Sequence, residues 1–149
     1  MIRLSKRCEY GLKAAIRLAN RQGEGYLQSR DIAQNEALPA KFLESILLAL
    51  RSAQILESKV GAGGGYRLSR PADQISVSDL MSALERSEPE PDRSAEADRV
   101  TAGRVALEVV NQRIGDALSE AVGSLSLAEL STLAQEKSQN GQATSMYYI

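Results

Sequence analysis

The chain has 149 residues, of which 43% are hydrophobic and 25% charged, and its formal net charge is −1. This composition excludes wholesale disorder and collagen-like repeats, and the length favours one compact core with an appendage. The charge is unevenly distributed, because residues 1–70 carry 12 basic and 6 acidic side chains (net +6) and residues 71–149 carry 6 and 13 (net −7). The first half is therefore expected to face a polyanion, and the acidic half to have another role.

Residue counts also exclude several classes of protein. One cysteine and no histidine allow neither an internal disulfide, nor a conventional zinc site within one chain, nor a thiol–histidine hydrolase. The glycine run lacks the Lys-Ser/Thr of a phosphate-binding loop, which disfavours nucleotide binding. Because the chain also has no histidine and no paired nucleophile and base, no enzyme is expected. The N-terminus is charged and no apolar run approaches the 18 or so residues that cross a bilayer, which predicts a cytoplasmic protein.

The first 50 residues predict three helices. Ser5 can cap a helix that runs to about Gln22, with apolar residues recurring at helical spacing. A second, short helix starts at Gln28 or Ser29 and ends near Glu36, and Pro39 is well placed to begin the third. Two helices joined by so short a break indicate a helix-turn-helix.

Beyond Ile55 the pattern changes to that of a β-hairpin. The segments 55–60 and 66–69 flank the glycine run 61–65, and a fourth helix follows that Ser76 can cap. A helix-turn-helix followed by a hairpin is the order of elements in a winged helix. The predicted fold class is mainly α with a small β-hairpin wing.

The C-terminal half predicts a linker, a long helix and a tail. Residues 1–85 form the expected winged helix-turn-helix domain and 86–99 a charged linker; 100–136 hold a long helix and a short one, and 137–149 form the tail. Ser126 and Glu129 have the spacing of a capping box for the short helix. The long helix has an apolar stripe that needs a partner surface, and we expect it to be the dimerisation face: Leu107, Val110, Ile114, Ala117 and Ala121.

The start of the third helix is the predicted reader of DNA bases. Lys41 can meet phosphate or guanine, Glu44 can accept a hydrogen bond from cytosine, and Ser45 can pair with several bases. Phe42 can pack on a sugar or a thymine methyl group, or it can belong to the core. Glu44 has a second interpretation too, as a carboxylate that stabilises the helix N-terminus.

Phosphate contacts are predicted at the other helix starts and on the wing. The wing tip would bring bare backbone close to DNA with Arg70 nearby, although a glycine run alone also fits a flexible turn, and single surface cations are often only solvated. The predicted contacts are Lys6, Arg7, Gln28, Ser29, Arg30, Lys59, Gly63, Gly64, Tyr66 and Arg67.

Cys8 lies on the apolar side of the first helix, so a buried, inert thiol is the first interpretation. A redox or ligand role for Cys8, together with Glu9, is the alternative.

Three motifs together resemble one family. The opening residues 1–6 with Tyr10, the segment 40–44 and the glycine-rich wing 61–66 look like the Rrf-type (IscR/NsrR/CymR-like) bacterial winged-helix transcription regulators. The resemblance implies a homodimer, joined by the long helix, on a palindromic operator. Cluster-binding members hold iron–sulfur with three cysteines in the loop before that helix, whereas residues 86–100 contain none. The chain therefore looks more like the cluster-free branch.

The predicted function is that of a dimeric, sequence-specific DNA-binding transcription regulator, a repressor rather than an activator. No cofactor is predicted, and an iron–sulfur site that uses Cys8 and Glu9 is the alternative. A protein or small-molecule effector is left open. The competing hypothesis is a winged helix that serves as a protein-interaction module.

Overall fold

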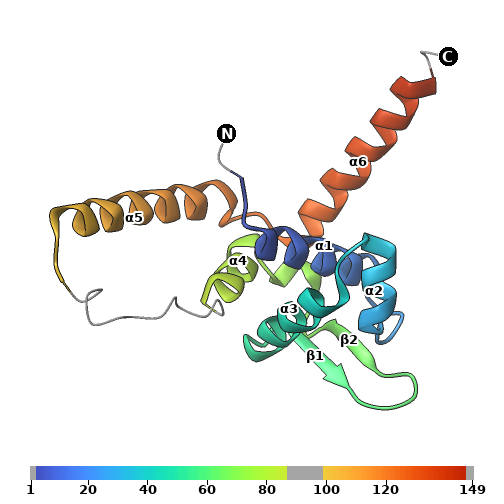
Figure 1. Cartoon of the computed structure of the whole chain (residues 1–149). Coiled ribbons are helices and arrows are strands. Elements are labelled where there is room, and N and C mark those ends of the chain that lie inside the picture. Colours follow the sequence, from blue (N-terminus) through green and yellow to red (C-terminus); the bar gives the residue numbers. More distant parts are fainter. Residues whose placement is uncertain (1–2, 87–98, 147–149) are drawn as a thin grey trace.

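The computed structural model describes residues 3–86 and 99–146 (Figure 1). Its elements follow the predicted order, with one short 3-10 helix in addition. They are α1 (Lys6–Asn20), α2 (Ser29–Glu36), α3 (Ala40–Ser52), β1 (Leu56–Lys59), β2 (Gly65–Leu68), η1 (Ala72–Gln74), α4 (Val77–Arg86), α5 (Ala102–Val122) and α6 (Leu127–Met146). The predicted mainly helical winged-helix fold is confirmed.

Hydrogen bonds from backbone N–H groups to short polar side chains fix where the helices begin. Ser5 Oγ accepts from the backbone N–H of Cys8 at 3.2 Å, and Ser76 Oγ accepts from that of Asp79 at 3.0 Å. At the start of α6 the bonds are reciprocal: Ser126 Oγ accepts from Glu129 N at 3.1 Å, and a Glu129 carboxylate oxygen accepts from Ser126 N at 3.3 Å. All three predicted caps therefore form.

The core lies between α1, α2, α3, α4 and the base of the wing. Its largest fully buried side chains are Ile32, Leu43, Ile46, Leu47, Leu50, Ile75, Leu80, Leu84 and Leu127. At one crossing the helices approach so closely that a Cβ atom on Gly11 would lie 2.3 Å from Leu84 Cδ1. A glycine in mid-helix usually weakens a helix, and here it lets α1 and α4 pack against each other.

The wing consists of the antiparallel strands β1 and β2. The segment before α2 adds a single β-bridge to β2. Leu56 pairs with Leu68 and Lys59 with Gly65, and Leu27 exchanges two backbone hydrogen bonds with Tyr66, at 2.8 and 2.7 Å. Gly65 has φ of 136°, and a Cβ there would lie 2.1 Å from the Leu27 carbonyl oxygen. Only glycine fits at this position, so the wing is fastened to the segment before α2.

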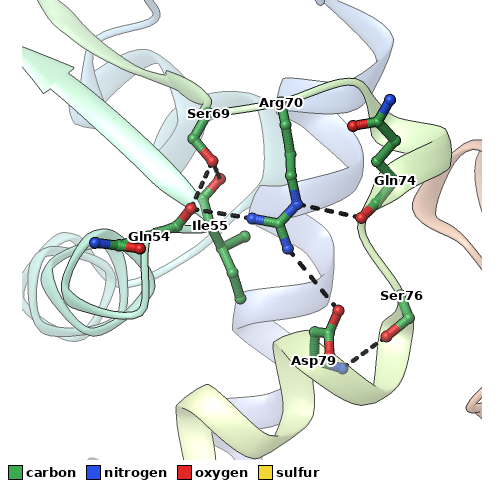
Figure 2. Close-up of polar contacts among 7 residues, drawn as sticks. All are labelled: Gln54, Ile55, Ser69, Arg70, Gln74, Ser76 and Asp79. Atoms are coloured by element: carbon green, nitrogen blue, oxygen red, sulfur yellow. Dashed lines mark hydrogen bonds and ion pairs between the residues drawn. The ribbon is translucent and has the colours of Figure 1, made fainter.

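Arg70 ties the base of the wing to three other elements (Figure 2). Its Nε donates to the Gln74 carbonyl and its Nη1 to the Gln54 carbonyl, both at 3.2 Å, and its Nη2 lies 3.9 Å from Asp79 Oδ2. Ser69 Oγ donates to the same Gln54 carbonyl. Arg70, which the sequence placed near DNA phosphate, thus joins the end of α3 to η1 and α4.

Helices α5 and α6 form an arm that is joined to the core around Leu127, where residues at the end of α5 and the start of α6 also pack. Leu127 is fully buried there. Two backbone hydrogen bonds flank it, from Val77 N to the Leu125 carbonyl and from Leu127 N to the Ile75 carbonyl, both at 2.9 Å. In Figure 1, α5 and α6 extend from the end of the molecule opposite the wing.

The last helix is longer than expected. The sequence predicts a short helix followed by a tail from residue 137, but α6 has 20 residues and continues to Met146. The supposed tail has no apolar stripe, and its Ser, Asn, Gly and Thr residues have low helix propensity, so the sequence pattern does not signal this extension of the helix. Residues 147–149 and most of the predicted linker lie outside the described residues. No helix in the described part of the chain is long and apolar enough to cross a membrane.

Candidate nucleic-acid interface

The first turns of α3 present an exposed face that the core does not use. Lys41, Glu44 and Ser45 are exposed, and 64% of Phe42 is accessible, whereas Leu43 on the inner face is fully buried. The interpretation of Phe42 as a core residue is therefore wrong. An exposed aromatic ring among polar side chains can contact sugars and thymine methyl groups.

A sharp turn sets the position of α3 against α2. Ala37 ends α2 in a left-handed conformation, with φ of 53°, and Leu38 N donates to the Ala33 carbonyl at 2.9 Å. The two helices enclose a depression of about 560 Å³ that brings Ser29 and Arg30 together with Glu44. Gln28 is exposed at the start of α2, where its side chain caps no backbone group. All four residues were predicted from the sequence, and the fold brings Ser29 and Arg30 to the same depression as Glu44 of the predicted reader.

The tip of the wing is exposed as predicted, but its residues differ in role. Lys59 is exposed, and so is 96% of Val60. Gly63 lies in the open with φ of 71°, whereas Gly64 is buried and a Cβ on it would lie 2.2 Å from the Lys59 carbonyl oxygen. Tyr66 is half-buried against the core. Gly64 and Tyr66 thus shape the wing, and Lys59 and Gly63 form its accessible surface.

Arg67 is held by two neighbours, one on the wing and one in the segment before α2. Its Nε donates to a Glu57 carboxylate oxygen, and its guanidinium lies 4.4 Å from the centre of the Tyr26 ring. The hydrogen bond that Arg67 donates to Glu57 raises the pKa of Arg67, so the group stays charged. The Glu57 carboxylate offsets that charge locally, whereas Lys59 has no ion-pair partner within residues 3–86 and 99–146. Lys59 is the wing cation best placed to meet a phosphate.

At the start of α1, Lys6 and Arg7 have different surroundings. Lys6 Nζ donates to Glu9 Oε2 at 3.1 Å on the surface, and this bond raises the pKa of Lys6. Arg7 is half-buried; its Nε donates to the Leu84 carbonyl at 3.1 Å and its Nη1 to Ser45 Oγ at 3.2 Å. Sequence reasoning named Arg7 and Ser45 as separate DNA contacts and missed the bond between them, because no local pattern joins residues 38 positions apart.

Cys8 and Glu9 point to different surroundings. Cys8 is 2% exposed and borders a groove of about 630 Å³ between the start of α1, α4 and α5, while Glu9 is paired with Lys6. Protein-held iron–sulfur clusters need several thiolates, and this chain has one cysteine. The described residues contain no group of three potential metal ligands either. The donors of one chain, a single thiolate among the residues that the structure describes, do not match the ligand set of such a cluster.

The long helix α5 carries the predicted apolar stripe on its surface. Its five members, Leu107, Val110, Ile114, Ala117 and Ala121, are all exposed, and α5 buries no residue fully. Leu118 and Val122 instead lie against the core. The stripe is therefore open to a partner, and two of its members, Ile114 and Ala117, also line the groove beside α1 and α4.

Comparisons with known proteins agree with this geometry. The profile of the family described as "Rrf2: Iron-dependent Transcriptional regulator" matches residues 4–132. An HTH-type transcriptional regulator of Synechocystis is 33% identical over 134 residues, which cover 87% of each chain. CymR of Bacillus subtilis is 37% identical over 84 residues, or 56% of this chain and 61% of CymR.

Solved structures give the same result. The structure of CymR, the global cysteine regulator of B. subtilis, has a TM-score of 0.67 and 34% identity, covering 89% of this chain and 98% of CymR. T. potens IscR also has a TM-score of 0.67, with 29% identity, covering 91% of this chain and 90% of IscR. The chain therefore belongs to the Rrf2 family of transcriptional regulators, DNA-binding proteins with a winged helix-turn-helix.

Proposed function

We propose that the protein is a homodimeric repressor that binds a palindromic operator through α3 and the wing, without an iron–sulfur cluster of its own. The observation that carries this proposal is the exposed face of α3, where Lys41, Phe42, Glu44 and Ser45 all stand clear of the core. Within one and a half turns, α3 presents a cation that donates hydrogen bonds (Lys41), an apolar ring (Phe42) and a carboxylate that accepts them (Glu44). These groups suit the edges of base pairs in a major groove.

The dimer would form through the exposed stripe of α5. Leu107, Val110 and Ile114 lie on one face of this helix, and a continuous apolar face of this kind is seldom left in contact with water. A second copy of the same stripe is self-complementary about a two-fold axis. Such an axis would place the two α3 helices on inverted half-sites, so the operator would be palindromic.

Repression would follow from occupancy of the operator. The single cysteine supports a cluster-free regulator, so another signal must act on the dimer. A protein or small-molecule effector that shifts one α3 helix relative to the other would change operator affinity, because both half-sites must be met at once.

A binding titration tests the proposal. DNA enriched from a random pool by the purified protein should form a specific complex whose affinity falls steeply with salt. Lys41→Ala and Lys59→Ala should weaken binding and, where the lysine meets phosphate, flatten the salt dependence by about one unit of slope each. Glu44→Ala should change the preferred base at one position in each half-site. Lys137→Ala on α6 is the matched control and should change nothing.

Two results would contradict the proposal. One is a wild-type dimer that forms no sequence-preferring complex in low salt. The other is normal regulation in cells by the Lys41→Ala/Lys59→Ala double variant, which is the result expected of a protein-interaction module.

A further inference from the structure

Arg7 connects three helices through one guanidinium group. It is the second residue of α1, and its Nε donates to the carbonyl of Leu84 near the end of α4. Its Nη1 points to α3 and donates to Ser45 Oγ. Because the guanidinium is planar and rigid, the bond to Leu84 also fixes the direction from which Arg7 approaches Ser45.

We infer that Arg7 is a positioning residue that makes the Ser45 hydroxyl a hydrogen-bond donor toward bases. A serine hydroxyl has one hydrogen to donate and two lone pairs that accept. Arg7 occupies one lone pair with a charged donor, and that charge strengthens the O–H as a donor. A base amino group that approached the remaining lone pair would bring its positive hydrogen toward the guanidinium. Both effects favour an acceptor as the partner of Ser45.

This assignment narrows what Ser45 can read. The acceptors in the major groove are N7 and O6 of guanine, N7 of adenine and O4 of thymine, while cytosine presents only an amino donor there. Glu44, the neighbouring residue, is an acceptor when ionised. Adjacent residues of α3 would then have opposite polarity, with Glu44 selecting a donor and Ser45 an acceptor. The inference rests on the proposed reading of DNA by α3.

The competing role for Arg7 is a direct phosphate contact. A phosphate contact adds affinity for every sequence and steepens the salt dependence, whereas a positioning residue alters discrimination between sequences. The two roles therefore predict different changes when Arg7 is replaced.

The test compares operators with and without purine N7. Each purine of the selected operator is replaced in turn by its 7-deaza analogue, and affinity is measured by fluorescence anisotropy at several salt concentrations. With wild-type protein, one position in each half-site should lose about tenfold in affinity. With Ser45→Ala and with Arg7→Met this loss should disappear, the double variant should lose no more than either single variant, and Arg7→Met should keep the wild-type salt slope.

Controls separate this result from misfolding and from loss of charge. Arg104→Met removes an exposed arginine of α5 and should keep the wild-type sensitivity to 7-deaza purines. If Arg7→Met fails to fold, Arg7→Lys replaces it, because an ammonium keeps the charge but cannot hold both partners in the same geometry. Its sensitivity to 7-deaza purines should also fall.

Three outcomes would overturn the inference. They are a shallower salt slope in Arg7→Met, losses from Arg7→Met and Ser45→Ala that multiply in the double variant, and full 7-deaza sensitivity in the Arg7 variant that folds. A wild-type protein without any preferred operator would instead refute the proposed function, and the inference with it.

Discussion

Ala37 and Gln54 adopt left-handed backbone conformations, with φ of 53° and 62°. For a residue with a Cβ atom this conformation costs about 1–2 kcal/mol relative to an ordinary helical one. Both residues end a helix where the chain must turn at once. The turn at Ala37 leads into α3, and the turn at Gln54 directs a carbonyl toward Ser69 and Arg70. Backbone strain at these two positions therefore allows the sharp turns that set the positions of α3 and of the wing.

Ala37→Gly should stabilise the protein by about 1 kcal/mol, because glycine adopts the left-handed conformation without the Cβ penalty. Ala53→Gly makes the same chemical change at the end of α3, where φ is −81°. It should lower stability by about 0.5–1 kcal/mol, since glycine only adds entropy to the unfolded chain there. Urea denaturation of both variants measures the two changes. Shifts of the same sign would show that the Ala37 conformation carries no strain.

The surface chemistry of single residues was predictable from sequence, but their partners were not. The helix start predicts that Lys41, Glu44 and Ser45 are accessible, because the apolar period assigns their neighbours to the core. The same pattern does not predict the hydrogen bond between Arg7 and Ser45 or the ion pair between Arg67 and Glu57. Each pair forms only after segments that are separate in the sequence pack together. For Phe42 even exposure could not be predicted, because an aromatic residue next to an apolar stripe can face either the core or the solvent.

At the scale of elements, the position of the wing depends on the hydrogen bonds at its base as much as on the glycine turn at its tip. Arg70 donates to two carbonyls that belong to different elements, and its side chain is partly buried. Arg70→Met should therefore cost about 1–3 kcal/mol, because two carbonyls lose a charged donor. The wing should also loosen, and faster amide hydrogen exchange in β1 and β2 would report it.

Arg21→Met provides the comparison for Arg70→Met. Arg21 is an exposed arginine at the end of α1 that pairs with Glu24 on the surface. Exposed pairs contribute about 0–1 kcal/mol, so this variant should stay close to wild type. Equal losses in both variants would contradict the role given to Arg70.

Strong periodicity and capping signals explain why the order of elements was predictable. Ser5, Ser76 and Ser126 mark helix starts by local chemistry, and the caps form as expected. Two features lacked such a signal. The bridge from Leu27 to Tyr66 involves a single residue and has no period. The second half of α6 has no apolar stripe and contains Ser, Asn, Gly and Thr, so its sequence pattern predicts a tail rather than a helix.

For the whole molecule, the exposed stripe of α5 predicts an obligate dimer. Val110→Glu places a charge within the stripe, and burial of an unpaired carboxylate costs several kcal/mol. We expect the dimer dissociation constant to rise at least about a hundredfold, and operator binding to weaken with it. Sedimentation equilibrium measures the first change and a gel-shift titration the second.

Gln112→Glu is the matched control for the dimer prediction. It adds the same side chain two residues away, about 200° around the helix from Val110. Gln112 is exposed and lies outside the stripe, so this variant should remain dimeric. Dissociation of both variants would point to a different interface.

The charge asymmetry is sharper than a division into halves suggests. Residues 71–98 contain 2 basic and 8 acidic side chains, a net −6, whereas residues 99–149 contain 4 and 5, a net −1. The acidic excess thus belongs to the segment between the wing and the arm. Because α5 and α6 are nearly neutral, two arms can approach without strong mutual repulsion.

The joint at Leu127 has a geometric consequence for operator choice. A 21-residue helix such as α5 is about 32 Å long. If two arms meet at a dimer axis, a 10° change at the joint moves the far end of α5 by roughly 5 Å, more than the 3.4 Å between neighbouring base pairs. The fully buried leucine and its two flanking backbone hydrogen bonds therefore hold α5 at a fixed angle to the core. This angle would set the number of base pairs between the two half-sites that one dimer can bind.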